Sequence, residues 1–155
     1  MGRINNVKMP AKKGLVVMIF ILITAVAAVI TLLALDRHGS VGFTVLSEKD
    51  IPQEIAGEVI PEYRSLERAL ACMVDDKVYV VVTRGEKPAS GYKVDISRMK
   101  LEEEKGRQLL VVYADFCDPD GKDSISQVLT YPLKVAETDL EKLPDDIELR
   151  VQYKE

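Results

Sequence analysis

Apolar and polar positions change abruptly in pattern along the chain. The run Leu15–Leu35 contains no charged residue, proline or glycine, and only Thr24 and Thr31 in it are polar. A helix that rises about 1.5 Å per residue needs roughly 20 such residues to cross the hydrocarbon core of a bilayer. We therefore predict a transmembrane helix over residues 14–35, with the membrane contact made by residues 15–35.

Charge on the two sides of this run predicts its orientation. The preceding tail, residues 1–13, carries Arg3, Lys8, Lys12 and Lys13 and no acidic residue. Short basic flanks stay in the cytoplasm. We therefore expect a single-pass protein of the cell membrane, with a cytoplasmic tail, a linker over residues 36–42 and an extracytoplasmic domain over residues 43–155.

A cleaved signal peptide is the main alternative to this signal anchor. The small residues Ala25, Val26 and Ala27 fit a cleavage site, but signal peptides usually have an apolar region of only about 7–15 residues. Here the apolar sequence continues to Leu35, which favours a retained anchor. A buried helix of a soluble protein is the least favoured interpretation, because nothing else in the chain is apolar enough to surround it.

Beyond the linker the pattern is typical of strands. Runs rich in β-branched and aromatic residues, some of them alternating, are bounded by turn residues. Pro132 interrupts one run and indicates an edge strand or a bulge. The expected strands cover residues 43–46, 78–83, 92–96, 109–116, 128–136 and 147–153. Short turns or loops are expected at 75–77, 85–91 and 118–121, and a charged connection that includes the acidic run 102–104 is expected at 98–106.

Helical periodicity occurs early in this domain. Pro61 suits the first position of a helix. Counted from Leu66, apolar residues follow at offsets of three, four and seven: Ala69, Leu70 and Met73. This predicts an amphipathic helix over residues 61–73, and single helical turns are expected at 47–50 and 138–143. Short connections favour antiparallel pairing. The predicted fold is α+β, a small, mostly antiparallel β domain with one amphipathic helix.

Composition limits the partners and the redox chemistry. All 25 acidic residues follow residue 35, so the predicted extracytoplasmic domain is acidic. Nucleic acid and anionic lipid head groups require basic patches, so neither is expected as a ligand. Cys72 and Cys117 could form a disulfide in an extracytoplasmic setting. Two buried free thiols are the alternative.

One segment resembles a known family. An apolar strand leads into Gly85-Glu-Lys87-Pro88-Ala-Ser90-Gly91-Tyr92 and then into an alternating strand. Further on, Val and Tyr fill a strand before Pro119, and Thr130-Tyr131-Pro132 follows. This order is similar to the C-terminal domain of the PrcB family of protease-complex subunits, although Ala89 and Ser90 replace the family's usual Thr-Gly. The resemblance covers about residues 78–135.

The resemblance implies a non-catalytic, extracytoplasmic domain of the bacterial cell envelope that associates with a surface or secreted serine protease complex. The loop is expected to be a hairpin tip that the glycines and Pro88 make rigid. In the alternative interpretation these residues only form a tight turn, and Tyr92 packs in the core. The candidate partner-binding residues are Gly85, Lys87, Pro88, Ser90, Gly91, Tyr92, Tyr131 and Pro132.

Catalytic patterns fit poorly. Ser90 and Lys93 match the S-x-x-K pattern of penicillin-binding enzymes, but a loop followed by a strand would send them to opposite faces. The chain's one histidine, His38, lies beside the apolar run. Four aspartates (Asp115, Asp118, Asp120 and Asp123) miss the EF-hand spacing, and a solvated acidic turn is favoured over a calcium site. No enzyme activity, metal, cofactor or small-molecule substrate is expected.

Two functions from different classes follow from these observations. The first is a membrane-anchored binding module that docks on a protease complex and stabilises or regulates it. The second is a structural envelope protein whose β domain assembles with itself or with other membrane proteins. An envelope hydrolase is a weak third.

Overall fold

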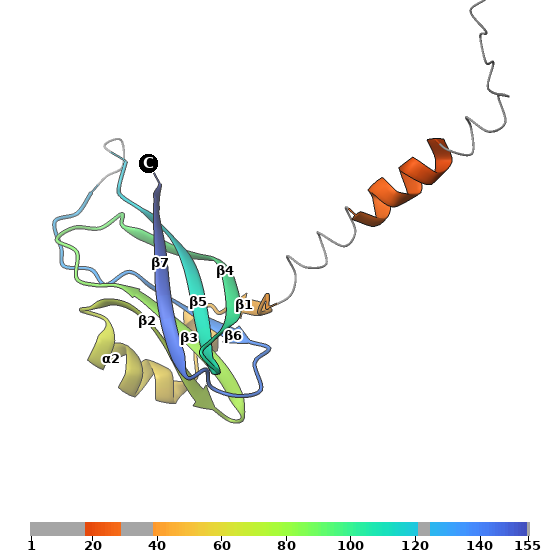
Figure 1. Cartoon of the computed structure of the whole chain (residues 1–155). Helices are drawn as coiled ribbons and strands as arrows, with labels where there is room; N and C mark the ends of the chain where they lie inside the picture. Colours follow the sequence, from red (N-terminus) through yellow and green to blue (C-terminus); the bar gives the residue numbers. More distant parts are fainter. Residues whose placement is uncertain (1–17, 29–38, 121–124, 155) are drawn as a thin grey trace, which may run out of the picture. The chain divides into compact units, whose positions relative to one another are not determined.

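The computed structural model describes residues 18–28, 39–120 and 125–154, and the chain divides into two units, Met1–His38 and Gly39–Glu155. In the first unit, residues 18–28 form a helix (Figure 1). No helix in these described ranges has both the length and the apolar character needed to cross a membrane. The ends of the predicted span, the basic tail and residues 36–38 of the linker lie outside the described residues. The transmembrane segment therefore stays a prediction.

The second unit is a small, mostly antiparallel β domain with a short helix, as the sequence predicts. Its strands form two sheets rather than one: a four-stranded sheet in the order β1-β6-β3-β2 and a three-stranded sheet in the order β4-β5-β7. Neighbouring strands are antiparallel except β5 and β7, which are parallel. The strands are β1 (Phe43–Val45), β2 (Glu67–Val74), β3 (Lys77–Arg84), β4 (Lys93–Glu104), β5 (Arg107–Cys117), β6 (Leu133–Thr138) and β7 (Asp146–Lys154).

Strand β3 lies at the centre of the domain and is buried on both faces. Val80 and Val82 join the core between the two sheets, where they pack with residues such as Phe116 of β5. Tyr79 and Val81 join a second cluster on the opposite face, together with Ile55 of the helical segment. A strand covered on both faces has no polar side to show, which explains the nearly continuous apolar run that predicted it.

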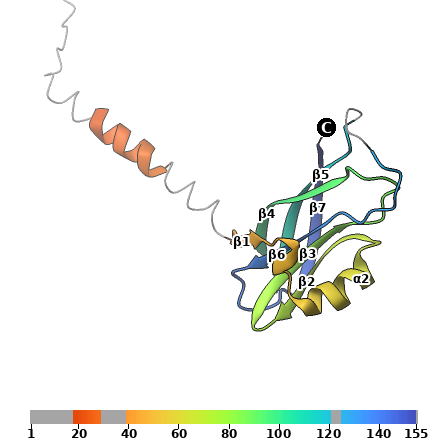
Figure 2. The same cartoon turned by 180° about the vertical axis from the view of Figure 1, so that it is seen from behind.

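The helix covers this second face of the four-stranded sheet (Figure 2). The helical segment consists of a π-helical turn, η2 (Ile55–Val59), that continues into α2 (Ile60–Tyr63). The prediction of a helix over residues 61–73 is therefore wrong. Residues 67–74 form β2 instead, because a two-residue turn through Asp75 and Asp76 folds them back onto β3. Both aspartates have positive φ, as a tight hairpin turn of this kind requires.

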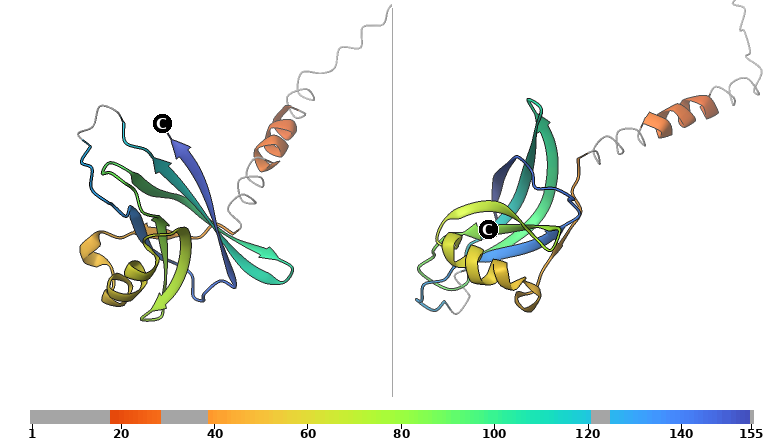
Figure 3. Two further views of the ribbon diagram at one scale, coloured as in Figure 1. Left: turned by 90° about the vertical axis from the view of Figure 1, so that its left-hand side faces the viewer. Right: turned by 90° about the horizontal axis from the view of Figure 1, so that it is seen from below.

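Most of the charged stretch 98–106 is also strand rather than connection, because β4 continues to Glu104. It belongs to the long hairpin of β4 and β5, which turns at Lys105 and Gly106, and Figure 3 shows the tip of this hairpin extending past its neighbours. After a bulge at Ser97, Met99 lies in the core while Arg98 points outward. The acidic run 102–104 lies at the exposed end of β4, where its charges stay in contact with solvent.

The segment before β1 fastens one sheet to the other. The N–H of Val41 donates to the carbonyl of Met99 on β4 at 3.1 Å, and β1 itself pairs with β6. The expected turn at 47–50 is present as the 3-10 turn η1 (Glu48–Asp50). The helical turn expected at 138–143 is absent from this part of the described chain: Thr138 ends β6, and its hydroxyl donates to the carbonyl of Val78 at 2.8 Å.

Candidate functional site

Two loops far apart in the sequence meet beside the start of β6. Lys87 and Thr130 exchange two backbone hydrogen bonds of 2.9 Å each, which forms an isolated antiparallel bridge. We call residues 85–92 and 125–132 the paired loops. All eight candidate partner-binding residues lie in them, so the structure brings together the two groups that the sequence placed about forty residues apart.

Side-chain hydroxyls extend this pairing. The Thr130 hydroxyl donates to the carbonyl of Ala89 at 2.7 Å. The N–H of Ser90 donates to the carbonyl of Ser126, and the N–H of Ser126 donates to the Ser90 hydroxyl, both at 2.9 Å. The prediction that the first loop is a hairpin tip is therefore wrong. This loop carries the chain from β3 in one sheet to β4 in the other and is fixed along its length by the second loop.

The two glycines of the first loop are needed for its backbone. Gly85 has φ +77° and Gly91 has φ +93°, in the region that other residues rarely adopt. A Cβ on Gly91 would lie only 2.8 Å from the Cβ of Pro119, and one on Gly85 would lie 3.2 Å from the carbonyl oxygen of Ser65. Both glycines are therefore required by the conformation of this loop.

Arg84 is buried next to the paired loops, and the sequence did not indicate it as a site residue. Its side chain is 2% exposed at the end of β3. Nη1 donates to the carbonyl of Cys117 at 2.6 Å and to that of Lys93 at 3.3 Å, while Nη2 pairs with the carboxylate of Asp118. One guanidinium group thus joins the end of β3 to the start of β4 and the end of β5. The sequence did contain one signal for Arg84, because a cation there directly follows the buried apolar run 78–83.

Aromatic rings surround this guanidinium group. The rings of Tyr92 and Phe116 each lie 5.0 Å from the guanidinium carbon, and that of Tyr153 lies at 5.9 Å. Phe116 and Tyr153 also meet edge to face with their centroids 5.9 Å apart. Tyr92 is therefore half-buried against Arg84, with Lys87 Nζ 5.9 Å from its ring. Cation–π contacts of this kind stabilise most when they are desolvated, as around Arg84.

Tyr131 and Pro132 tie the second loop to the helix and to β3. The Tyr131 hydroxyl donates to the Glu86 carboxylate at 2.7 Å, and this bond raises the pKa of Tyr131 above its usual value. The guanidinium of Arg64 lies 4.5 Å from the centre of the same ring. Pro132, which lacks an N–H, accepts from the N–H of Arg84 at 2.9 Å just before β6 begins. Neither an edge strand nor a bulge is needed to accommodate it.

The outward side of the second loop is apolar. Val128 is 55% exposed and Leu129 is 62% exposed, and Ile125 beside them is also exposed. Large aliphatic side chains on a loop whose backbone is pinned from within are available for contact with another molecule. The sequence pattern assigned Val128 and Leu129 to a strand and so did not indicate their exposure.

The other reactive groups considered from the sequence have structural partners. Ser90 bonds to Ser126, Asp118 pairs with Arg84, and Asp115 pairs with Lys154 at 2.6 Å. No cluster of three metal-ligating side chains occurs among the residues that the structure describes, and Asp123 and His38 lie outside them.

The two cysteines are separate thiols in this structure. Cys72 lies on β2 and Cys117 at the end of β5, in different sheets, and both are free. The disulfide considered from the sequence is therefore not formed here. Burial raises the pKa of the Cys72 thiol.

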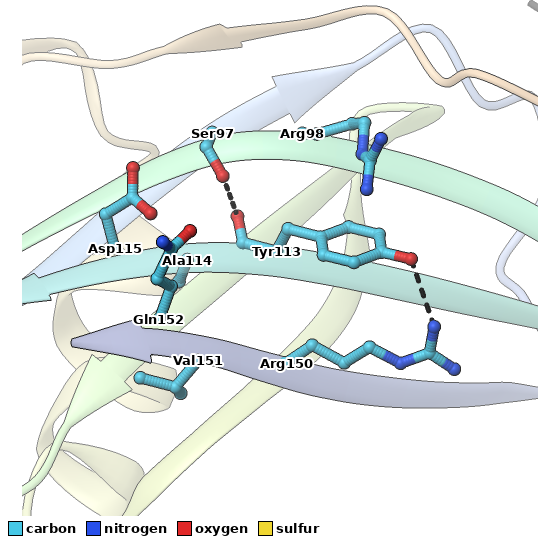
Figure 4. Close-up of a pocket in the computed structure, with 8 residues that line it drawn as sticks. All are labelled: Ser97, Arg98, Tyr113, Ala114, Asp115, Arg150, Val151 and Gln152. Carbon is cyan, nitrogen blue, oxygen red and sulfur yellow. Dashed lines mark hydrogen bonds between the residues drawn. The ribbon is translucent and has the colours of Figure 1, made fainter.

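A second concave surface lies on the outer face of the three-stranded sheet. This open hollow of about 330 Å³ centres on Tyr113, with Arg98 and Arg150 on the neighbouring strands (Figure 4). Arg150 donates to the Tyr113 hydroxyl at 3.0 Å and pairs with Glu148 at 2.8 Å, and Arg98 lies 4.1 Å from the ring centre. Its polar groups largely satisfy one another, so the paired loops are the stronger candidate site.

Comparison with known proteins gives one match, which covers part of the chain. Residues 78–139 match the family model described as PrcB C-terminal. The resemblance seen in the sequence is therefore confirmed: this segment is similar to the PrcB C-terminal domain. No curated protein and no solved structure matches the chain. The matched segment contains both paired loops, and it indicates a relation to protease-complex subunits.

Proposed function

We propose that this protein is a membrane-anchored, non-catalytic, extracytoplasmic binding module that docks on a surface or secreted serine protease complex and stabilises or regulates it. One observation carries the proposal: the segment matched by the family model contains two loops that hydrogen-bond to each other and expose Val128 and Leu129. The apolar run at 15–35 supplies the anchor in this proposal.

The loop geometry suits a docking surface. Backbone bonds between Lys87 and Thr130, and between Ser90 and Ser126, hold the loops before any partner arrives. A pre-ordered surface loses less conformational entropy on binding than a loop that must become ordered. Exposed aliphatic side chains then contribute apolar contact at the centre of the interface, with Lys87 and Glu86 nearby as polar surroundings. A small interface of this kind suffices if the two partners share one membrane, because tethering raises the effective concentration.

The proposed role is non-catalytic because the hydroxyl in the family loop already has a structural task. Ser90 accepts a hydrogen bond from the Ser126 backbone, and its neighbour on the second loop, Thr130, donates to a backbone carbonyl. A nucleophile requires a base within hydrogen-bond reach. An active-site serine probe should therefore leave the purified protein unlabelled, and labelling at Ser90 would contradict this part of the proposal.

Capture of partners from native membranes tests the proposal. We expect full-length protein to co-purify with a subtilisin-like serine protease, and Leu129→Ser to reduce that capture by about tenfold or more, as for an interface residue worth over 1 kcal/mol. Leu143→Ser is the matched control, because Leu143 is exposed but lies outside the paired loops. Equal capture by both variants would remove the site. Homo-oligomers without a protease would instead favour the structural envelope role.

The membrane anchor has its own test. Full-length protein should stay in the membrane pellet through a carbonate wash. A soluble form that begins after residue 27 would overturn the anchor and show the run to be a cleaved signal.

A further inference from the structure

Strand β6 has an edge that is only half covered. β1 pairs with residues Ala136 to Thr138, and the N–H of Leu46 makes one further bond of 2.8 Å to the carbonyl of Val135. The chain then leaves the sheet as η1. Within the described chain, no strand pairs with this edge of β6 before Val135.

The backbone of Leu133 faces outward at this edge. The N–H of Arg84 bonds to the carbonyl of Pro132, so this carbonyl faces β3. Hydrogen-bonded and non-hydrogen-bonded pairs alternate along an antiparallel ladder. The N–H and carbonyl of Leu133 therefore point away from β3, and the outward carbonyl of Val135, which already binds Leu46, follows the same alternation.

A groove of about 510 Å³ lies along this edge. Its lining is mainly apolar and comes from the segment after β1, from the helix and from β6; it includes Leu46, Ile51, Ile60, Tyr131 and Leu133. Two opposite charges also line it, Glu48 and Lys134. Neither makes an ion pair with any described residue.

The exposed edge of β7 is different. Its outward residues include Glu148, Arg150 and Lys154, and charged side chains discourage pairing with another strand. The apolar gap on β6 lacks this protection on its helix side. It also begins at Tyr131 and Pro132, so it is continuous with the paired loops.

We infer that this gap takes an extended peptide segment of the partner, which adds to the four-stranded sheet in line with β1 and antiparallel to β6. The inference deepens the proposed function, on which it rests for the source of the segment. The incoming strand carries aliphatic side chains opposite Leu133 and Tyr131 and an acidic side chain opposite Lys134. The residue before the acidic one turns away from β6, because Leu46 occupies the position opposite Val135, and carries a basic side chain that meets Glu48. Main-chain bonds give such strand addition its affinity, and the side-chain pockets give it specificity.

A blocked synthetic peptide of lysine, glutamate, valine, threonine and valine, in that order, is the probe. We expect it to bind full-length protein and to protect the amide of Leu133 from hydrogen exchange. N-methylation of the first valine, which faces Leu133, should abolish binding, whereas N-methylation of the threonine, whose N–H faces away, should preserve it. Equal effects of the two methyl groups, or an unprotected Leu133 amide at millimolar peptide, would overturn strand addition.

Charge reversal at the groove gives a second readout. Glu48 is exposed, so Glu48→Lys should leave the fold intact while weakening the peptide roughly fivefold. A peptide with glutamate in place of the lysine should recover the lost affinity on the Glu48→Lys variant. Glu102→Lys on exposed β4 is the matched control and should change neither peptide. Failure of the swapped peptide to recover binding would contradict the assigned direction of the strand.

The two proposals fail in different ways. Peptide binding without capture of a protease refutes the proposed function and leaves the strand site standing. Capture of a protease with no peptide binding refutes the strand site alone. Protection of Leu133 that rises with protein concentration in the absence of peptide would assign the edge to a second copy of this chain and overturn the inference.

Discussion

The paired loops and the outer face of the three-stranded sheet solve the same problem in opposite ways. In the paired loops, polar groups point inward and bond to one another or to Arg84, which leaves Val128 and Leu129 exposed. On the outer face, Arg98 and Arg150 contact the ring and the hydroxyl of Tyr113 from the two neighbouring strands, and Arg150 also pairs with Glu148. The first surface has apolar area left for a partner, whereas the second has already matched most of its charges internally.

Position in the fold explains this contrast. The outer face is built from regular ladders in which cross-strand neighbours meet at fixed spacing, so opposite charges pair locally. The loops must instead cross between two sheets, and their backbone groups need partners outside any ladder. The two loops provide these partners for each other, and the guanidinium of Arg84 bonds to the strand ends beside them, at Lys93 and Cys117. Changing each region should therefore affect the molecule to a different degree.

Arg84→Met should produce the largest loss. It leaves the carbonyls of Cys117 and Lys93 without their donor inside the domain, which should lower the free energy of unfolding by about 2–4 kcal/mol. Asp118 adds little to that loss because it is 67% exposed and stays solvated. Urea denaturation measures the change. Arg84→Lys should recover only part of the free energy of unfolding that Arg84→Met loses, because one ammonium group cannot reproduce the spread N–H donors of a guanidinium group. Full recovery would show that the charge alone matters.

Gly91→Ala should rank second. Positive φ costs about 1 kcal/mol for a residue with a Cβ, and the contact with Pro119 adds about 1 kcal/mol of overpacking, because only one methyl group is inserted. Gly106→Ala at the β4–β5 turn is the matched control, since it has φ +78° with open space around the added Cβ. It should show only the backbone cost. Similar unfolding midpoints for the two variants would mean that the loop yields at Pro119.

Strands β3, β7 and β2 show how much of the fold the sequence can predict. The buried run of β3 and the alternation of β7 identify strands because their burial follows directly from local pattern. In β2, apolar residues occupy both faces of an edge strand, and their spacing happens to fit one face of a helix. Pairing with β3 through the turn at Asp75 decides the outcome there, and periodicity within the segment carries no information about that pairing.

The sequence indicated both loops of the candidate site but not that they pair. Family resemblance selected both loops, but the bridge between Lys87 and Thr130 is non-local and no spacing rule implies it. Arg84 was missed because a cation at the end of a strand is ordinarily a surface residue. Its burial depends on three carbonyl or carboxylate partners that arrive from other strands. The exposure of Leu129 follows from the late start of β6, which in turn depends on the loop pairing.

Arg98→Met tests the outer face and should have a smaller effect. It removes a cation from the face of Tyr113 at an exposed position, a contact worth about 0.5–1 kcal/mol. Capture of the protease partner should be unchanged, because this surface is not the proposed site. Denaturation and co-purification of the same preparation provide both measurements. Lost capture with stability retained would move the binding surface from the paired loops to this sheet.

Acidification should produce the smallest effect, and it acts on the outer face. The hydrogen bond from Arg150 lowers the pKa of Glu148 below its usual value. A carboxyl group with a lowered pKa in the folded state contributes stability above its unfolded pKa, and this contribution disappears as pH falls through the folded value. Glu148→Gln should therefore lower stability slightly at neutral pH and leave it unchanged in acid, which makes the acid-side fall shallower, and added salt should diminish the difference. Denaturation midpoints measured from neutral pH down to about pH 3 would show this. An unchanged acid slope would mean that solvent already screens the Arg150 pair, and the charges of the outer face would then contribute to solubility and to the protection of the β7 edge rather than to stability.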